Sequence, residues 1–164
     1  MRVERPSRET RAVPTPADLV LLENDPRIVE LLSWFLRRRG HRVRQAASFA
    51  ELRSRLRERA PDLLLSDVEL GAESARAELP RLAAEGLLPP TLVVSGYLDR
   101  ELSAELCAIP GVIGVLAKPF EFQRLEVLIH EHLEGRRAPA AASAAATSGS
   151  ERALAPPRRA DPAP

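Results

Sequence analysis

Five short runs of consecutive apolar residues alternate along this chain with longer segments whose apolar residues recur at helical spacing. The runs lie at residues 18–22, 63–65, 91–95 and 112–117, with a weaker one at 41–46. Strands that are continuously apolar are buried on both faces, which is typical of parallel sheets in α/β proteins. With right-handed crossovers, the pattern predicts a doubly wound, five-stranded parallel sheet in the strand order 2-1-3-4-5.

The segments between the runs carry helix start and stop signals. Asp25 is a candidate N-cap with Pro26 at the first helical position, and Ser48 with Glu51 forms a capping box. Helices are therefore expected from Asp25 to Gly40, from Ser48 to Pro61, from Leu79 to Gly86, from Leu98 to Ile109, and from Phe122 onward.

Composition limits the ordered part of the chain to residues 18–134. Residues 1–17 and 135–164 lack apolar periodicity, and the second segment is rich in Ala, Pro and Arg, so both are expected to be disordered. The two segments hold nine arginines and four acids, which leaves 15 basic and 19 acidic residues in between. Because the predicted domain is acidic, nucleic acid is not expected as a partner.

The sequence also favours a cytoplasmic protein. No apolar run reaches about 18 residues, so neither a membrane span nor a membrane partner is expected. The first residues contain no apolar core of a secretory signal. The single cysteine, Cys107, excludes an internal disulfide and fits a reducing compartment.

Polar residues follow the predicted strands where the carboxyl ends of a parallel sheet meet. The first strand ends in Glu23 and Asn24, the third in Asp67, the fourth in Ser95, and the fifth in Lys118, the only lysine of the chain. Ligands of such sheets bind outside these strand ends. Crowded carboxylates favour Mg²⁺, an aspartate can accept a phosphoryl group, and a lysine can hold its oxygens.

At these strand ends the chain resembles the receiver domain of response regulators in two-component signalling. The matching segments are residues 20–26, 63–67, 93–97 and 118–120, and the resemblance covers about 18–134. Each motif alone is weak, whereas four of them in order, each at a strand end, are specific. The resemblance implies a flavodoxin-like receiver fold.

The resemblance also implies a role for each site residue. Asp67 is the expected phospho-acceptor, Ser95 the switch hydroxyl, and Lys118 the phosphate contact, with a cis peptide bond before Pro119. Glu69 lies where family members tune the loss of the phosphoryl group. The expected Mg²⁺ ligands are Glu23, Asn24, Asp67 and Glu69.

Three positions depart from the family pattern. Asn24 replaces an acidic residue of the family, so Mg²⁺ should bind weakly. Asp25 either takes the place of that acid as a metal ligand or serves only as a helix N-cap. Leu70 and Gly71 stand where the family often has a proline. Val115 replaces the aromatic residue that reports phosphorylation in the family.

We therefore expect a stand-alone receiver that takes a phosphoryl group on Asp67 from a histidine kinase or phosphotransfer protein. Its output would be contact with another protein, through the fourth helix, fifth strand and fifth helix, and it would catalyse only its own phosphotransfer and dephosphorylation. The alternative is a degenerate receiver that binds partners without phosphorylation. An aspartate-based phosphatase is disfavoured because Glu69 replaces its second aspartate, and a nucleotide-binding protein because no glycine-rich turn follows the first strand.

Overall fold

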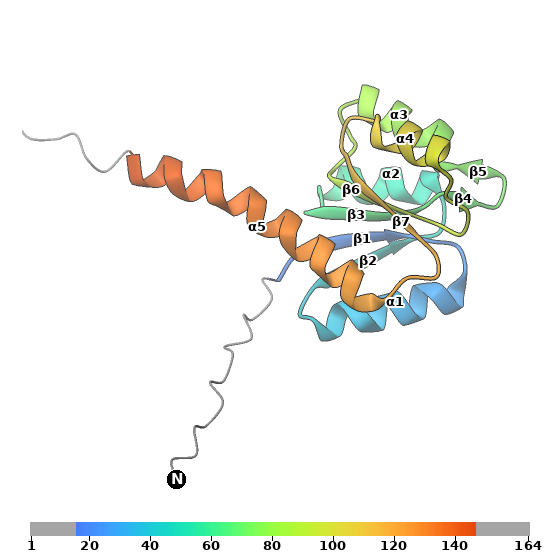
Figure 1. Cartoon of the computed structure of the whole chain (residues 1–164), viewed down its shortest axis with the longest axis horizontal. Coiled ribbons are helices and arrows are strands. Elements are labelled where there is room, and N and C mark those ends of the chain that lie inside the picture. The colour runs from blue at the N-terminus through green and yellow to red at the C-terminus, as the bar shows by residue number, and fades with distance from the viewer. Residues whose placement is uncertain (1–15, 147–164) are drawn as a thin grey trace, which may run out of the picture. The chain divides into compact units, whose positions relative to one another are not determined.

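Five parallel strands form the central sheet of this computed structural model, which describes residues 16–146 and, for side chains, residues 16–136 (Figure 1). The sheet order is β2-β1-β3-β6-β7, all pairs are parallel, and each strand is separated from the next one along the sequence by at least one helix. The predicted doubly wound sheet and its strand order are confirmed. In chain order the elements are β1 (Asp18–Leu22), α1 (Pro26–Arg38), β2 (Arg42–Ala46), α2 (Phe49–Glu58), β3 (Leu63–Asp67), β4 (Glu69–Leu70), β5 (Glu73–Ser74), α3 (Ala75–Ala84), β6 (Thr91–Ser95), α4 (Arg100–Cys107), β7 (Val112–Ala117) and α5 (Phe122–Ala146).

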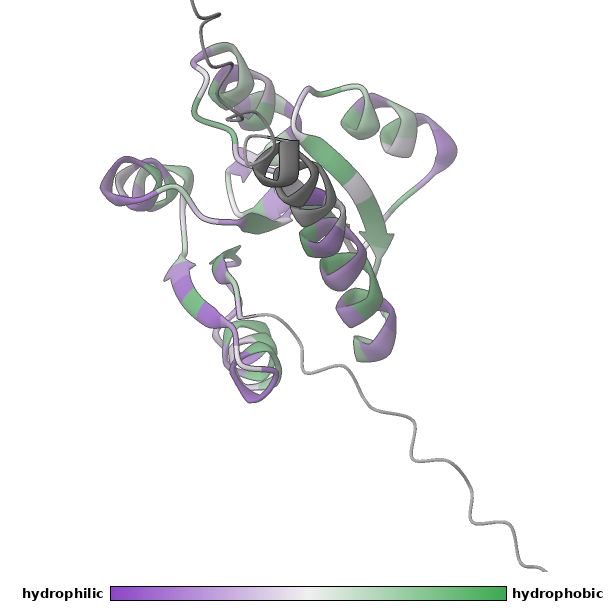
Figure 2. Cartoon of the chain, turned by 90° about the vertical axis from the view of Figure 1, so that its left-hand side faces the viewer, coloured by the Kyte–Doolittle hydropathy of each residue, from purple (hydrophilic) through white to green (hydrophobic). Residues whose placement is uncertain are grey.

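Two apolar layers cover the two faces of the sheet. Because successive strand residues point to opposite faces, Leu19 and Leu21 of β1 join one layer and Val20 and Leu22 the other. The first layer is completed by apolar residues of α1 and α5, and the second by residues of α2, α3 and α4. In Figure 2 the helices carry both green and purple residues, as expected of helices with one face on the sheet and one in solvent.

The helix caps explain where the connections turn. The Asp25 carboxylate accepts the backbone N–H of Arg27 at 2.9 Å, so the predicted N-cap of α1 is confirmed. Gly40, with φ at 86°, adopts the left-handed conformation that ends this helix. Ser48 Oγ accepts the Glu51 N–H at 3.2 Å, as a capping box requires.

The segment after β3 differs from the prediction. It contains a hairpin of β4 and β5, whose turn includes Gly71 at a φ of 70°. The helix expected from Leu79 begins at Ala75, because Ser74 caps it by accepting the Arg76 N–H. Pro80 therefore lies inside α3, where it lacks the N–H that would donate to the carbonyl four residues earlier.

Helix α5 also differs from the prediction, because it continues to Ala146. The part of the expected disordered tail between residues 135 and 146 is therefore helical, in keeping with the high helix propensity of its alanines. The expected disorder of residues 1–15 and 147–164 lies outside the described residues. Within residues 16–146, no helix combines the length and apolar character that crossing a bilayer requires.

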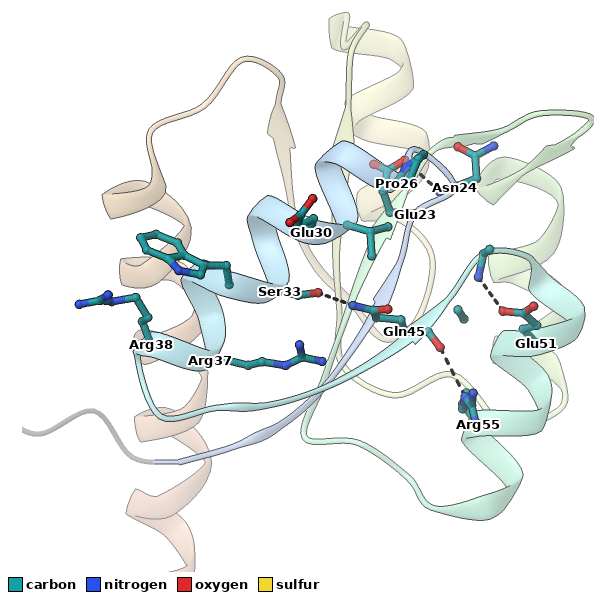
Figure 3. Close-up of a pocket in the computed structure, with 14 residues that line it drawn as sticks. Glu23, Asn24, Pro26, Glu30, Ser33, Arg37, Arg38, Gln45, Glu51 and Arg55 are labelled. Carbon is teal, nitrogen blue, oxygen red and sulfur yellow. Dashed lines mark hydrogen bonds between the residues drawn. The ribbon is translucent and has the colours of Figure 1, made fainter.

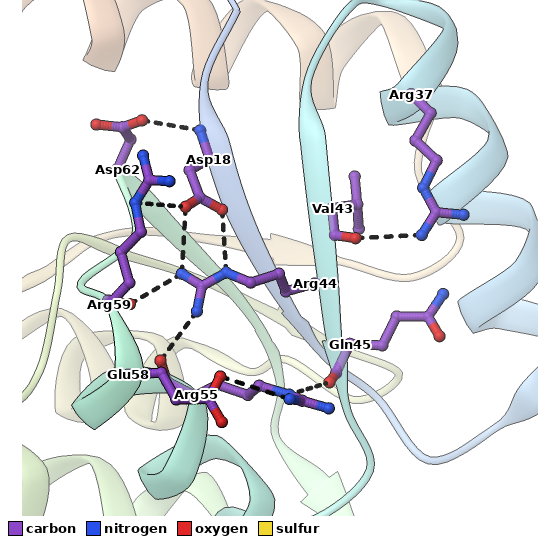
Figure 4. A network of polar contacts seen from close by, with 9 residues as sticks. All are labelled: Asp18, Arg37, Val43, Arg44, Gln45, Arg55, Glu58, Arg59 and Asp62. Atoms are coloured by element: carbon purple, nitrogen blue, oxygen red, sulfur yellow. Dashed lines mark hydrogen bonds and ion pairs between the residues drawn. The ribbon is translucent and has the colours of Figure 1, made fainter.

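Arginine side chains fix the outer strand β2 to its neighbours (Figure 4). Asp18, only 5% exposed, binds both Arg44 Nε at 3.1 Å and Arg59 Nε at 3.2 Å. Arg44 also donates to the carbonyls of residues 55 and 59 at the end of α2. On the other edge of β2, Arg37 donates to the Val43 carbonyl at 3.1 Å, and Arg55 to that of residue 45.

Candidate functional site

The register of the sheet aligns the ends of four strands. Leu22 pairs with Ser66, so Glu23, which directly follows β1, and Asp67, the last residue of β3, lie at the same level of the sheet. The pairing of β6 with β7 sets Ser95 beside Ala117, directly before Lys118. The backbone N–H of Lys118 donates to the Ser95 carbonyl at 2.6 Å, and the peptide bond to Pro119 is cis, as predicted.

Lys118 lies between the two carboxylates at the centre of this edge. Its Nζ donates to Glu23 Oε2 and to Asp67 Oδ2, at 2.8 Å each. The side chain of Glu23 is 3% exposed, that of Asp67 14% and that of Lys118 20%. Burial lowers the pKa of Lys118, but the hydrogen bonds and charges of the two carboxylates outweigh burial and raise it.

Backbone N–H groups hold the other oxygens of the two carboxylates. Glu23 Oε1 accepts the N–H groups of Asn24 and Asp25 at 3.0 Å each, at the turn into α1. Asp67 Oδ1 accepts the N–H of Val68 at 2.7 Å. Each oxygen of both carboxylates thus has a partner, and only the less buried Asp67 lines the cavity at the strand ends.

A cavity of about 520 Å³ opens at the carboxyl ends of β3, β6 and β7. It is lined by Asp67, Val68, Glu69, Arg76, Ser95, Gly96, Tyr97, Asp99, Glu101, Leu102 and Lys118. The structure therefore brings together the predicted acceptor, hydroxyl and lysine in one open space. The cavity also contains Arg76, which sequence reasoning missed because the predicted helix began too late to include it.

Ser95 is bound to the loop that leads into α4. Its hydroxyl accepts the N–H of Tyr97 at 3.2 Å and donates to the carbonyl oxygen of the same residue. Ser95 is buried, whereas Tyr97 is 73% exposed and its hydroxyl donates to Asp99, the N-cap of α4. The predicted switch hydroxyl thus touches the start of a helix as well as the cavity.

The expected metal ligands are only partly brought together. Glu23 and Asp67 share Lys118, whereas Asn24 and Glu69 are exposed. A Cβ added at Gly71 would lie 3.8 Å from Asn24 Nδ2, so this side chain lies beside the hairpin turn. Among the described side chains, no three acidic, histidine or cysteine residues are grouped as a metal site. The carboxylate and amide oxygens of these residues are the type of ligand that Mg²⁺ prefers, but the charge of Lys118 already offsets one of the two carboxylates, Glu23 and Asp67.

A second cavity, of about 970 Å³, lies between α1, β2 and α2 (Figure 3). Glu23 and Asn24 line one end of it, and Trp34, 57% exposed, lies near the other, with the Arg38 guanidinium over its ring. Inside it, Gln45 Nε2 donates to the buried Ser33 Oγ at 2.8 Å. Asp67, Ser95 and Lys118 do not line this space, so the chemistry belongs to the smaller cavity.

Comparison with known proteins gives concordant matches. The Transcriptional regulatory protein ZraR of Escherichia coli O157:H7 is 28% identical over 128 residues, covering 75% of this chain and 29% of that protein. The protein of the same name from Salmonella typhimurium is 27% identical over 132 residues, covering 77% of this chain and 30% of that protein. The chain thus spans less than a third of the length of these curated relatives.

Solved structures share the fold at low sequence identity. NtrX from Brucella abortus superposes with a TM-score of 0.69 at 23% identity, over 79% of this chain and 30% of that one. The signal receiver domain of an HD domain-containing protein from Pseudomonas fluorescens Pf-5 superposes with 0.68 at 19% identity, over 76% and 99%. The family model of the response regulator receiver domain matches residues 19–130, from the start of β1 to the first half of α5. With strand order, site geometry and family match in agreement, the chain belongs to the response regulator receiver domain family.

Proposed function

We propose that Asp67 accepts a phosphoryl group from a histidine kinase or phosphotransfer protein and that the phosphorylated domain signals through protein contacts. The observation that carries this proposal is the placement of Asp67, Ser95 and Lys118 around one open cavity. Asp67 is held by one backbone N–H and one ammonium, and its partial exposure leaves it accessible to a donor.

The transfer forms one bond and breaks one. A carboxylate oxygen of Asp67 attacks the phosphorus of a phosphohistidine, the phosphorus–nitrogen bond breaks, and the released imidazole nitrogen takes up a proton. Lys118 holds one phosphoryl oxygen. The Ser95 hydroxyl donates to another when it turns away from the Tyr97 carbonyl, which connects the site to the loop before α4.

The charges of the site support weak binding of the metal that phosphorylation is expected to require. Glu23, Asp67 and Lys118 together carry one net negative charge, because the lysine offsets one of the two carboxylates. Mg²⁺, when bound, would supply positive charge for the phosphoryl oxygens, with Glu23, Asp67, the Asn24 carbonyl and Glu69 as its proposed ligands. Because the Asn24 side chain carries no charge, we expect the affinity of the site for Mg²⁺ to be low.

The proposed activity is confined to the domain's own phosphoryl group. We propose that it acts on no other substrate and binds neither nucleic acid nor membrane, and that its partners are a phosphodonor protein and an output protein in the cytoplasm. ZraR is named a transcriptional regulatory protein, but this chain covers only 29% of it, so the output of this chain is a separate question.

Phosphorylation by acetyl phosphate tests the proposal. The wild type, incubated with acetyl phosphate and Mg²⁺, should gain the mass of one phosphoryl group, with acetate as the leaving group. Asp67→Asn should gain none. Asp62→Asn is the matched control, because this carboxylate accepts the N–H of Asp18 at the start of β1, at the other end of the strand from Glu23, and the variant should gain mass like the wild type. No uptake by the wild type at high donor and Mg²⁺ would instead support an interaction module that needs no phosphorylation.

A further inference from the structure

Arg76 is a second cation at the cavity that contains Asp67. It lies in the first turn of α3, where the cap at Ser74 fixes its backbone, and it lines the cavity together with Lys118, which directly follows β7. The side chain of Arg76 is 53% exposed. A planar guanidinium is suited to bind two phosphoryl oxygens at once, which an ammonium cannot do.

In the unphosphorylated structure this guanidinium is bound to α4. Arg76 Nε donates to Glu105 Oε1 at 3.2 Å, and its Nη2 donates to Oε2 at 2.5 Å. Asp99 and Glu101, at the start of the same helix, also line the cavity. The helix α4 therefore presents carboxylates to the one arginine among the residues that line this cavity.

We propose that phosphorylation of Asp67 draws Arg76 from Glu105 to the phosphoryl oxygens and thereby releases α4. This inference rests on the proposed function. It assigns to Arg76 the role of a phosphoryl-contacting residue and to the ion pair with Glu105 the role of a latch.

The balance of charge favours this exchange. Phosphorylation raises the negative charge on residue 67 toward two, while Lys118 stays shared with Glu23. The competing pair of Arg76 with Glu105 is exposed on both sides, at 53% and 42%, and exposed ion pairs contribute little to stability. A bidentate contact to a phosphoryl group in a cavity is stronger than such a pair.

Two connections lead from the cavity to the same helix. Ser95 binds Tyr97, two residues before the N-cap of α4, and Arg76 binds Glu105 in its last turn. Glu105 lies one residue from Leu106, the only residue of α4 that is buried. A helix with so few buried side chains is readily displaced when a contact near its end is lost.

The test measures the lifetime of the phosphoryl group on Asp67 and amide exchange in α4. After phosphorylation with acetyl phosphate and Mg²⁺, exchange across Arg100–Cys107 should rise in the wild type. Arg76→Ala should shorten the phosphoryl lifetime by about threefold to tenfold, the effect of losing a charge-assisted contact. Glu105→Gln should lengthen it, because the arginine is no longer held by α4.

The opposite signs separate this role from a structural one. Both Arg76→Ala and Glu105→Gln break the ion pair, so both should raise amide exchange in α4 before phosphorylation. Only a contact between Arg76 and the phosphoryl group makes the phosphoryl lifetime shorter in the first variant and longer in the second. Arg81→Ala is the matched control, since Arg81 lies on the same helix, is itself 67% exposed in its ion pair with Glu78 and does not line the cavity. It should leave both measurements unchanged.

The outcomes distinguish this inference from the proposed function. If the wild type gains no phosphoryl group, both are overturned. If the wild type is phosphorylated but Arg76→Ala has the lifetime of Arg81→Ala, or Glu105→Gln shortens the lifetime, only the role of Arg76 is overturned.

Discussion

Replacing Lys118 by methionine should expose how far this lysine holds the strand ends together. Methionine keeps a flexible, unbranched stem of similar length, so the change removes the ammonium and little of the packing. The carboxylates of Glu23 and Asp67, 3% and 14% exposed, would then face one another without a cation. We expect the variant to fold with a lower free energy of unfolding at pH 7.

The contact distances set the size of the loss. At 2.8 Å and an effective dielectric constant of about 20, each of the two ion pairs contributes roughly 6 kcal/mol of Coulomb attraction, most of which offsets desolvation. Removing one partner of a buried pair costs about 3–5 kcal/mol. Because Lys118 is 20% exposed, we expect a loss near the lower limit, about 3 kcal/mol.

Urea unfolding between pH 7 and about pH 11.5 would test both the size and the origin of the loss. The pKa of Lys118 is raised, so its stabilisation is complete below the unfolded value of about 10.4 and declines only as the pH rises through the folded value. The pair of Arg81 with Glu78 gives the control, since Arg81 is 67% exposed and Glu78 keeps Arg53 as a second partner, so Arg81→Met should cost at most about 1 kcal/mol. A loss below about 1 kcal/mol at pH 7, or one that does not change with pH, would refute this account of the site.

Two further predictions concern charge at the first strand and at its neighbour. Asn24→Asp should tighten Mg²⁺ binding and lower the melting temperature without metal, because it adds a charged oxygen beside Glu23. Titration calorimetry measures the affinity, and an Mg²⁺ affinity equal to that of the wild type would mean that Asn24 does not face the metal. Burial lowers the pKa of His41 despite the nearby Glu126, so the wild type should lose stability as the pH falls below about 6.5. In His41→Leu, urea midpoints at pH 7.5 and 5.5 should differ by less than in the wild type, and an equal difference would contradict this role.

The parts of the fold that follow from the sequence are those with a strong periodic signal. Strands such as Leu63–Asp67 are buried on both faces, so their apolar runs are unbroken, and their order then follows from the rules of parallel sheets. The hairpin of β4 and β5 has two residues in each strand, too few for any period to appear. A helix that starts at Leu79 would have Pro80 in its first turn, where proline is favoured, whereas in the structure Pro80 lies within α3.

The site divides in the same way. That Glu23, Asp67 and Lys118 meet could be predicted, because each directly follows or ends a strand of one parallel sheet, whose carboxyl ends lie at the same edge. The direction of an exposed side chain depends on local contacts that no pattern records. Asn24 therefore lies by the hairpin turn, and the pairing of Arg76 with α4 was not anticipated.

The arginines along β2 have a consequence for how the domain behaves at high concentration. An outer strand normally offers free carbonyl groups to a strand of another molecule, which is the first step of aggregation. On β2 the carbonyls of Val43 and Gln45 are already bound by Arg37 and Arg55, and the strand carries charged side chains of its own. A strand added at this edge would first have to displace these two side-chain hydrogen bonds, which disfavours the pairing of two chains here.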